Sequence, residues 1–169
     1  VLALTQNGQF DEAKKLIKPM RSYAPHNLMY ALAEANIEIE SGSYDKAITR
    51  LQYALDFSPG SHPITMYLAE AYYRAGYFGD AEKLLKAHSR VKRMDAHLWY
   101  MLAEVQGKTG NILGLHQSRA EYFYLNGAMN QALQQLELAL PKAKDNVTYE
   151  RIQNRMVYFK NVARALGQL

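Results

Sequence analysis

The sequence of 169 residues has no cysteine, a single tryptophan and no long apolar run. Without cysteine it can form neither a disulfide nor a thiolate metal site, although this absence does not separate the cytosol from the periplasm. The lack of an apolar run of about twenty residues argues against direct insertion into a membrane. Because the chain opens at Val1 without an initiator methionine or signal peptide, and in the pattern of a helix end, we expect a piece of a longer protein.

Motifs for catalysis and metal binding are also missing. The five histidines show neither H-x3-H spacing nor an H-E-x-x-H motif; they are His26, His62, His88, His97 and His116. His26 and His62 fall in predicted turns, and His88 replaces a small packing residue on a predicted helix. Glu38 and Glu40 lie two apart on a predicted helix and do not face one another. We expect no catalytic residue, no cofactor and no metal ligand in this chain.

The net charge of +4 is unevenly distributed. Residues 1–84 contain eight Lys/Arg and ten Asp/Glu, whereas residues 85–169 contain twelve and six. Binding of nucleic acid would need a basic stripe with aromatic stacking partners. The only local cluster is Lys86, Arg90, Lys92 and Arg93, which we interpret as a solvated helix end. We therefore expect no nucleic-acid partner; that alternative predicts binding that weakens steeply with salt.

The sequence does contain a repeated motif of six residues. It reads Gly8-Gln9-Phe10-Asp11-Glu12-Ala13, then Gly42-Ser43-Tyr44-Asp45-Lys46-Ala47, then Gly76-Tyr77-Phe78-Gly79-Asp80-Ala81. The glycines are 34 residues apart, and Gly110 follows one period later. A 34-residue period is typical of tetratricopeptide repeats (TPRs), each a helix–turn–helix. Glycine allows the left-handed turn, the aromatic residue fills the gap between two helices, and alanine lets them pack closely.

The repeats predict an all-α TPR superhelix of about ten helices and no strands, with a non-standard C-terminal extension. Predicted helical segments include 1–6, 11–23, 28–41, 44–57, 112–126, 129–142 and 146–166. We divide a single solenoid over 1–169 into a partial first repeat at 1–27, repeats at 28–60, 61–94 and 95–126, and a terminal helix pair or cap at 127–169. Pro19 should kink its helix, because it lacks an amide hydrogen and its ring clashes with the preceding turn.

The period slips after Gly110. The next motif begins at Gly127, only 17 residues later, so one helix rather than two separates these glycines. Helix 112–126 should therefore end one repeat and begin the next. Within it, Leu115 occupies the position of the close-packing alanine and Arg119 that of the aromatic residue. The long helix 146–166 has one apolar side and a basic outer side, as the cap of a solenoid requires.

In a TPR array the first helices of successive repeats line a concave groove that accepts a peptide or a helix. Placed by their glycines, the groove candidates are Leu32, Asn36, Ile39, Glu40, Met66, Glu70, Tyr73, Arg74, Tyr100, Glu104 and Lys108. The alternative is that Leu32, Met66 and Tyr100 are core residues. In that case Glu70–Arg74 and Glu104–Lys108 are ordinary i,i+4 ion pairs. The pattern disfavours a carboxylate-clamp TPR, because Leu32 stands where that subclass has lysine.

The second half resembles a narrower family. The motifs, in order, are Leu98-Trp99-Tyr100-Met101-Leu102-Ala103-Glu104, Gly110-Asn111, Arg119-Ala120-Glu121-Tyr122, Leu125-x-Gly127, Gln131-Ala132, Gln135-Leu136-x-x-Ala139-Leu140 and Tyr149-x-Arg151-Ile152-x-x-Arg155. With the slip of half a period, this order resembles the C-terminal TPR region of BepA-type (YfgC-type) metallopeptidases of Gram-negative bacteria. The resemblance covers about 28–160, is most specific over 98–155, and is weakest in the first helix pair with Pro19.

The resemblance implies a periplasmic parent with an N-terminal zinc peptidase domain that carries an HExxH helix outside this chain. The chain would be its polypeptide-binding tail. Partners would be outer-membrane proteins, their assembly machinery and the parent's own peptidase domain, and the parent would act as a peptidase and chaperone. The alternative is a non-enzymatic TPR scaffold or assembly factor with no peptidase attached. An upstream HExxH helix would favour the first interpretation, and a lipobox cysteine the second.

Overall fold

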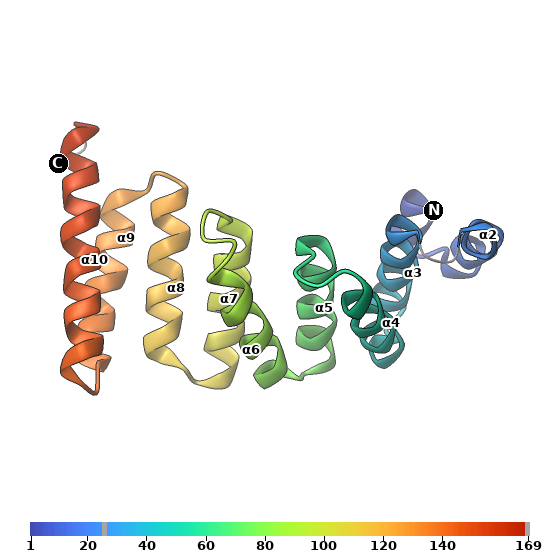
Figure 1. Ribbon diagram of the computed structural model, residues 1–169, viewed down its shortest axis with the longest axis horizontal. Coiled ribbons are helices and arrows are strands. Elements are labelled where there is room, and N and C mark those ends of the chain that lie inside the picture. Colours follow the sequence, from blue (N-terminus) through green and yellow to red (C-terminus); the bar gives the residue numbers. More distant parts are fainter. Residues whose placement is uncertain (25–26, 168–169) are drawn as a thin grey trace. The chain divides into compact units, whose positions relative to one another are not determined.

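A computed structural model describes residues 1–24 and 27–167, and Figure 1 shows it as a ribbon. The α-helices are α1 (Leu2–Gln6), α2 (Phe10–Tyr23), α3 (Leu28–Glu40), α4 (Tyr44–Phe57), α5 (His62–Ala75), α6 (Phe78–Ser89), α7 (Ala96–Thr109), α8 (Ile112–Leu125), α9 (Met129–Ala139) and α10 (Asn146–Ala165). Within these residues the expected ten helices and absence of strands are confirmed. The turn interpretation of His26 lies outside the described residues.

The predicted helix 129–142 differs from the observed one at its end. The α-helix stops at Ala139, and a 3₁₀ turn, η1 (Leu140–Lys142), completes the segment. Pro141 explains the change, because it has no amide hydrogen to donate to the carbonyl four residues earlier. By contrast, α2 continues through Pro19 to Tyr23, and the expected kink there stays a prediction.

The chain divides into two compact units, residues 1–84 and 85–169. This boundary separates the acidic half of the sequence from the basic half. A single solenoid with the repeat boundaries given above stays a prediction. Across residues 1–24 and 27–167, no helix is both long enough and apolar enough to cross a membrane.

In the first unit, α3, α4 and α5 pack against one another around an apolar core. The core is made of Leu32, Ala35, Ile39, Ala47, Ile48, Leu51, Ile64, Leu68 and Ala71. The glycine and alanine of the repeated motif have the roles that the sequence predicts. Gly76 ends α5 at φ +83°, a conformation that other residues rarely adopt, and Ala47 and Ala81 are fully buried where helices meet.

In the second unit, α8 packs against both α7 and α9, and α10 packs against α9. Figure 1 shows these helices side by side near the C-terminus. A buried cluster joins α8, α9 and α10 through Ala120, Leu136, Ile152 and Phe159. α8 thus has a packed neighbour on each side, as α4 has between α3 and α5, and the assignment of α8 to two repeats stays a prediction. Apolar residues accordingly surround this helix rather than forming one stripe.

The closest contact between α7 and α8 lies at Gly114, one residue before Leu115, which occupies the alanine position of the repeat. Leu115 fits at the alanine position because Gly107 lies opposite: a Cβ on Gly107 would be 3.1 Å from the Leu115 Cδ1. The tightest approach is at Gly114, where a Cβ would be 2.5 Å from the Gln106 Nε2. The Gln106 amide is itself held, because the Ser118 hydroxyl donates to its Oε1 at 2.7 Å. The sequence pattern did not reveal this contact.

Candidate functional site: two pockets on different faces of one helix

The apolar groove candidates of the first unit are buried. Leu32, Ile39 and Met66 are 7%, 1% and 9% exposed. Leu32 and Ile39 belong to the core that α3 shares with α4 and α5. As the alternative interpretation predicted for Leu32 and Met66, these three side chains are packing residues and present little surface to a ligand. Their spacing is the same for a groove and for a core, so the sequence pattern could not separate the two.

The polar candidates of the first unit lie at the surface. Arg74 bridges Glu40 and Glu70 at 3.2 Å each, which confirms the expected Glu70–Arg74 pair and adds a second helix to it. Partial desolvation lowers the pKa of Arg74, but the two carboxylates outweigh it and raise that pKa overall. Tyr73 is half-buried against Phe78, and Asn36 is also half-buried. These residues remain groove candidates.

Glu34 and Glu38 are less exposed than Glu40, and their ion pairs join helices. Arg50 donates to both of them, with the Arg50 Nη2 2.8 Å from Glu38 Oε1. Arg21 reaches Glu34 at 3.1 Å. Glu38, only 9% exposed, holds the pKa of Arg50 above its ordinary value through their hydrogen bond, against an opposing effect of burial. This network ties α2, α3 and α4 together.

In the second unit two of the predicted groove residues, Tyr100 and Glu104, line a pocket of about 250 Å³ between α7 and α8. We call it the tyrosine pocket; its lining includes Tyr100, Glu104, Arg119, Tyr122, Phe123 and Gln135. The rings of Tyr100 and Tyr122 lie 5.6 Å apart. Glu104 pairs with Arg119 at 3.8 Å, so the Glu104–Lys108 pair of the alternative interpretation is wrong. Lys108 is exposed and lies outside the lining.

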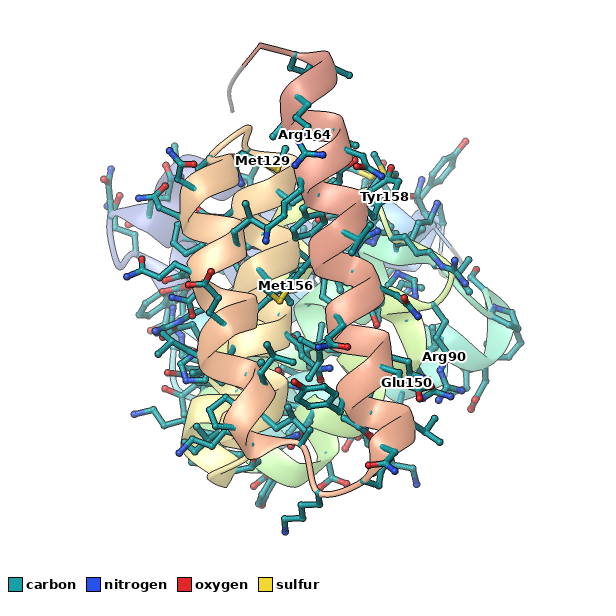
Figure 2. The ribbon with its side chains drawn as sticks, turned by 90° about the vertical axis from the view of Figure 1, so that its left-hand side faces the viewer. Arg90, Met129, Glu150, Met156, Tyr158 and Arg164 are labelled. Carbon is teal, nitrogen blue, oxygen red and sulfur yellow. The ribbon has the colours of Figure 1, made fainter. Side chains whose placement is uncertain are left out.

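A larger pocket of about 370 Å³ lies on a different face and was not predicted. We call it the basic pocket and define it by Lys86, Arg90, Trp99, Glu121, Arg151 and Arg155. Four of these side chains are cationic and one is anionic. Lys86 and Arg90 are exposed, as expected of a solvated helix end, yet they line the same pocket as two arginines of α10 that lie more than sixty residues away in sequence. Figure 2 shows Arg90 beside the N-terminal part of α10, close to Glu150.

Arg155 is the structural centre of the basic pocket. Its Nε donates to Glu121 Oε1 at 2.7 Å, and its Nη2 to the second carboxylate oxygen. The guanidinium also lies over the rings of Tyr124, Tyr158 and Phe159 at 5.2, 4.8 and 4.6 Å. Burial lowers the pKa of Arg155, but Glu121 raises it overall. The arginine is therefore fixed, while Lys86, Arg90 and Arg151 have exposed side chains.

Trp99 connects the basic pocket to the end of the preceding repeat. Its indole N–H donates to the Arg93 carbonyl at 2.8 Å, which anchors the segment that replaces the usual proline turn. The carboxylate of Asp95 accepts from the Leu98 amide at 2.7 Å and caps the start of α7. Two hydrogen bonds thus hold the edge of the pocket that carries the basic cluster.

The two pockets use different faces of α8. The basic pocket is lined by Gly114, Gln117, Ser118 and Glu121 of this helix, and the tyrosine pocket by Arg119, Tyr122 and Phe123. At about 100° per residue, the centres of these two sets lie roughly 140° apart around the helix. Glu104 and Glu121 both stand six residues before a turn glycine, yet they line different pockets. The same spacing to a turn glycine thus places one glutamate in the tyrosine pocket and the other in the basic pocket.

Metal binding has no support in residues 1–24 and 27–167, where no group of three or more His, Cys, Asp or Glu side chains could hold an ion. His88 is buried, and the Nδ1 of His116 lies 2.9 Å from Gln135 Oε1.

Comparison with known proteins agrees with the geometry. Residues 38–105 match the model of a family described as tetratricopeptide repeat. The solved structures similar to this chain include MamA 41-end from Desulfovibrio magneticus RS-1 (TM-score 0.67, 12% identity, 97% of this chain and 91% of that one). A thermophilic TPR protein of Thermus thermophilus has TM-score 0.58 at 19% identity, with 94% of each chain covered. The predicted TPR fold is confirmed.

The chain is also similar to two proteins named beta-barrel assembly-enhancing protease. The Escherichia coli (strain K12) protein is 27% identical over 144 residues, which is 85% of this chain. The Yersinia pestis protein is 28% identical over 141 residues, or 83% of this chain. The chain spans 29% of the length of each of these relatives. The resemblance to the TPR region of BepA-type proteins is thereby confirmed.

Proposed function

We propose that this chain is the client-binding tail of a periplasmic zinc metalloprotease and chaperone that acts in the assembly and quality control of outer-membrane proteins. The observation that supports this most is the similarity to beta-barrel assembly-enhancing proteases over 85% of the chain. The TPR fold and the two pockets are suited to holding polypeptide segments, such as outer-membrane proteins, their assembly machinery or the parent's own peptidase domain. The chemistry would be supplied by the peptidase domain, and this chain would hold the substrate.

The first test is the zinc content of the full-length parent and its cleavage of casein. About one zinc ion per chain, with cleavage abolished by a chelator, is the expected result. Zinc without cleavage would indicate a latent enzyme, with this tail a candidate for blocking its cleft. A parent with neither zinc nor cleavage would contradict the peptidase part of the proposal and favour the alternative, a TPR scaffold or assembly factor without a peptidase.

Client binding needs its own test. A photo-crosslinking residue at Tyr100, in the tyrosine pocket, should capture an unfolded outer-membrane β-barrel protein that is added to the full-length parent. The matched control places the same residue at Lys160, an exposed position of α10 outside both pockets. Equal capture at the two positions would show non-specific contact and contradict a defined binding surface.

A further inference from the structure

The basic pocket combines an apolar base with a cationic rim. Leu102, Leu136 and Ile152 line it and are almost fully buried, with Trp99 half-buried beside them. Gln106 and Ser118 hydrogen-bond to each other and also line it. A base of this kind accepts an apolar side chain, because the polar groups there already have partners.

The side chains that line the pocket carry more positive than negative charge, four cations against one carboxylate. Arg155 is matched by Glu121, whereas Lys86, Arg90 and Arg151 are exposed cations with no further carboxylate lining the pocket. Two exposed carboxylates lie outside the lining: Glu150, near Arg90 in Figure 2, and Asp145, which interacts electrostatically with Arg151. Three cations around one opening repel each other, so a negatively charged ligand relieves that repulsion as it binds.

We propose that the basic pocket binds an acidic segment of a partner polypeptide, with one apolar side chain at its base and flanking Asp or Glu carboxylates on Lys86, Arg90 and Arg151. This inference rests on the proposed function, since it names the kind of client segment that the tail selects. The volume of about 370 Å³ holds one or two side chains of a ligand rather than a whole small domain. Specificity then comes from charge, as in other interfaces with complementary potentials.

The single tryptophan allows this to be measured directly on the chain. Trp99 lines the pocket, so its fluorescence should change as a peptide binds. The probe is a synthetic peptide of about ten residues, with a central Phe-Leu pair flanked by Asp and Glu, a length suited to a groove-binding segment. The comparison peptide has Asn and Gln at every Asp and Glu, which keeps size and apolar content while removing the charge. Tighter binding of the acidic peptide, by about tenfold or more, is expected.

A pair of matched charge-reversal variants locates the site. Arg90→Glu with Arg151→Glu changes two exposed residues of the rim and should weaken binding of the acidic peptide about tenfold or more. Lys160→Glu with Arg164→Glu makes the same change in net charge at exposed positions of α10 outside the pocket and should weaken it by less than about threefold. Circular dichroism of both variants checks that they are folded.

Each outcome is decisive. Equal affinity for the acidic and the amide peptide overturns the proposal, as does an equal loss in the two variants, which would mean that only net charge matters. If Tyr100 crosslinks a client while the rim variants change nothing, the proposed function stands and the acidic preference fails. If the chain binds neither peptide and crosslinks no client, the proposed function itself fails. If the peptidase domain of the parent competes with the peptide, the occupant is an acidic segment of the same protein and not of a partner, which also overturns the proposal as stated.

Discussion

Glu121 and Arg155 stand one repeat period apart, 34 residues, and form a two-point ion pair between α8 and α10. The same separation joins Glu40 and Arg74 on α3 and α5. In both cases two residues one period apart, on different helices, carry opposite charges and form an ion pair. Glu121 is less exposed than Glu40, at 17% against 38%, whereas Arg155 and Arg74 are similarly exposed, at 36% and 41%. The Glu121 carboxylate therefore depends more on its ion pair, since a well-solvated carboxylate loses little without one.

We expect Arg155→Ala to lower the free energy of unfolding of the second unit by about 1–3 kcal/mol, because Glu121 would keep a poorly solvated carboxylate without its partner. The loss of contact with three aromatic rings adds to this. Urea denaturation followed by Trp99 fluorescence reports on this unit. Arg164→Ala on the same helix is the control and should change stability by less than about 0.5 kcal/mol. Similar effects of the two variants would contradict a structural role for the pair.

The close approach at Gly114 predicts an effect of a single methyl group. Gly114→Ala should destabilise the second unit by about 1–3 kcal/mol, because its Cβ would overlap with the Gln106 and Asn111 amides. The measurement is again urea denaturation. The matched control is Gly79→Ala in α6, where no atom lies within 4 Å of the added Cβ. That change should be neutral or stabilising, since alanine favours a helix. A neutral result at Gly114 would mean that Gln106 moves aside easily.

The ion-pair network of the first unit predicts a second stability effect. Arg50→Ala should lower the free energy of unfolding by about 1–3 kcal/mol, since Glu38 would be left nearly buried without this cation. Hydrogen exchange of the α3 and α4 amides localises the loss. Lys46→Ala, at an exposed position of α4, should leave these amides unchanged. Faster exchange in both variants alike would point to a general loss of helix and not to the network.

The start of α10 should respond to acid. The Asp145 carboxylate accepts from the Thr148 amide at 2.8 Å and from its hydroxyl at 2.9 Å, and these hydrogen bonds lower the pKa of Asp145. A carboxyl group with a depressed pKa in the folded state stabilises above its ordinary pKa of about 4, and this stabilisation is lost as pH falls through the lower folded value. The Thr148 amide resonance should therefore titrate with a midpoint below about 4.

Asp145→Asn provides the control for that titration. Asparagine caps a helix about as well as aspartate but carries no titrating charge. The variant should therefore keep the start of α10 folded and remove the pH dependence at Thr148. A midpoint at or above that of an ordinary aspartate would contradict the capping assignment.

The fold was largely predictable, because a 34-residue period is typical of one architecture, the helix–turn–helix repeats of a TPR array. The turn glycines and the buried alanines followed from spacing alone. The exposure of individual residues did not, because the same apolar spacing serves a groove or a core, as Leu32 and Ile39 demonstrate. The basic pocket was missed because its cations come from two distant segments. The recurrence of charge at Glu121 and Arg155, one period apart, is the signal that could have indicated part of it.

The two-sided packing of α8 also limits how the protein can be shortened or recombined. A repeat array is usually edited in steps of two helices, because each step exposes an equivalent face. Removal of α9 and α10 would instead leave α8 with an uncovered apolar side, including the buried Ala120. Removal of α7 would uncover its other side, at Gly114 and Ser118. A shortened chain that keeps both sides of α8 covered therefore has to retain α7 and α9 beside it.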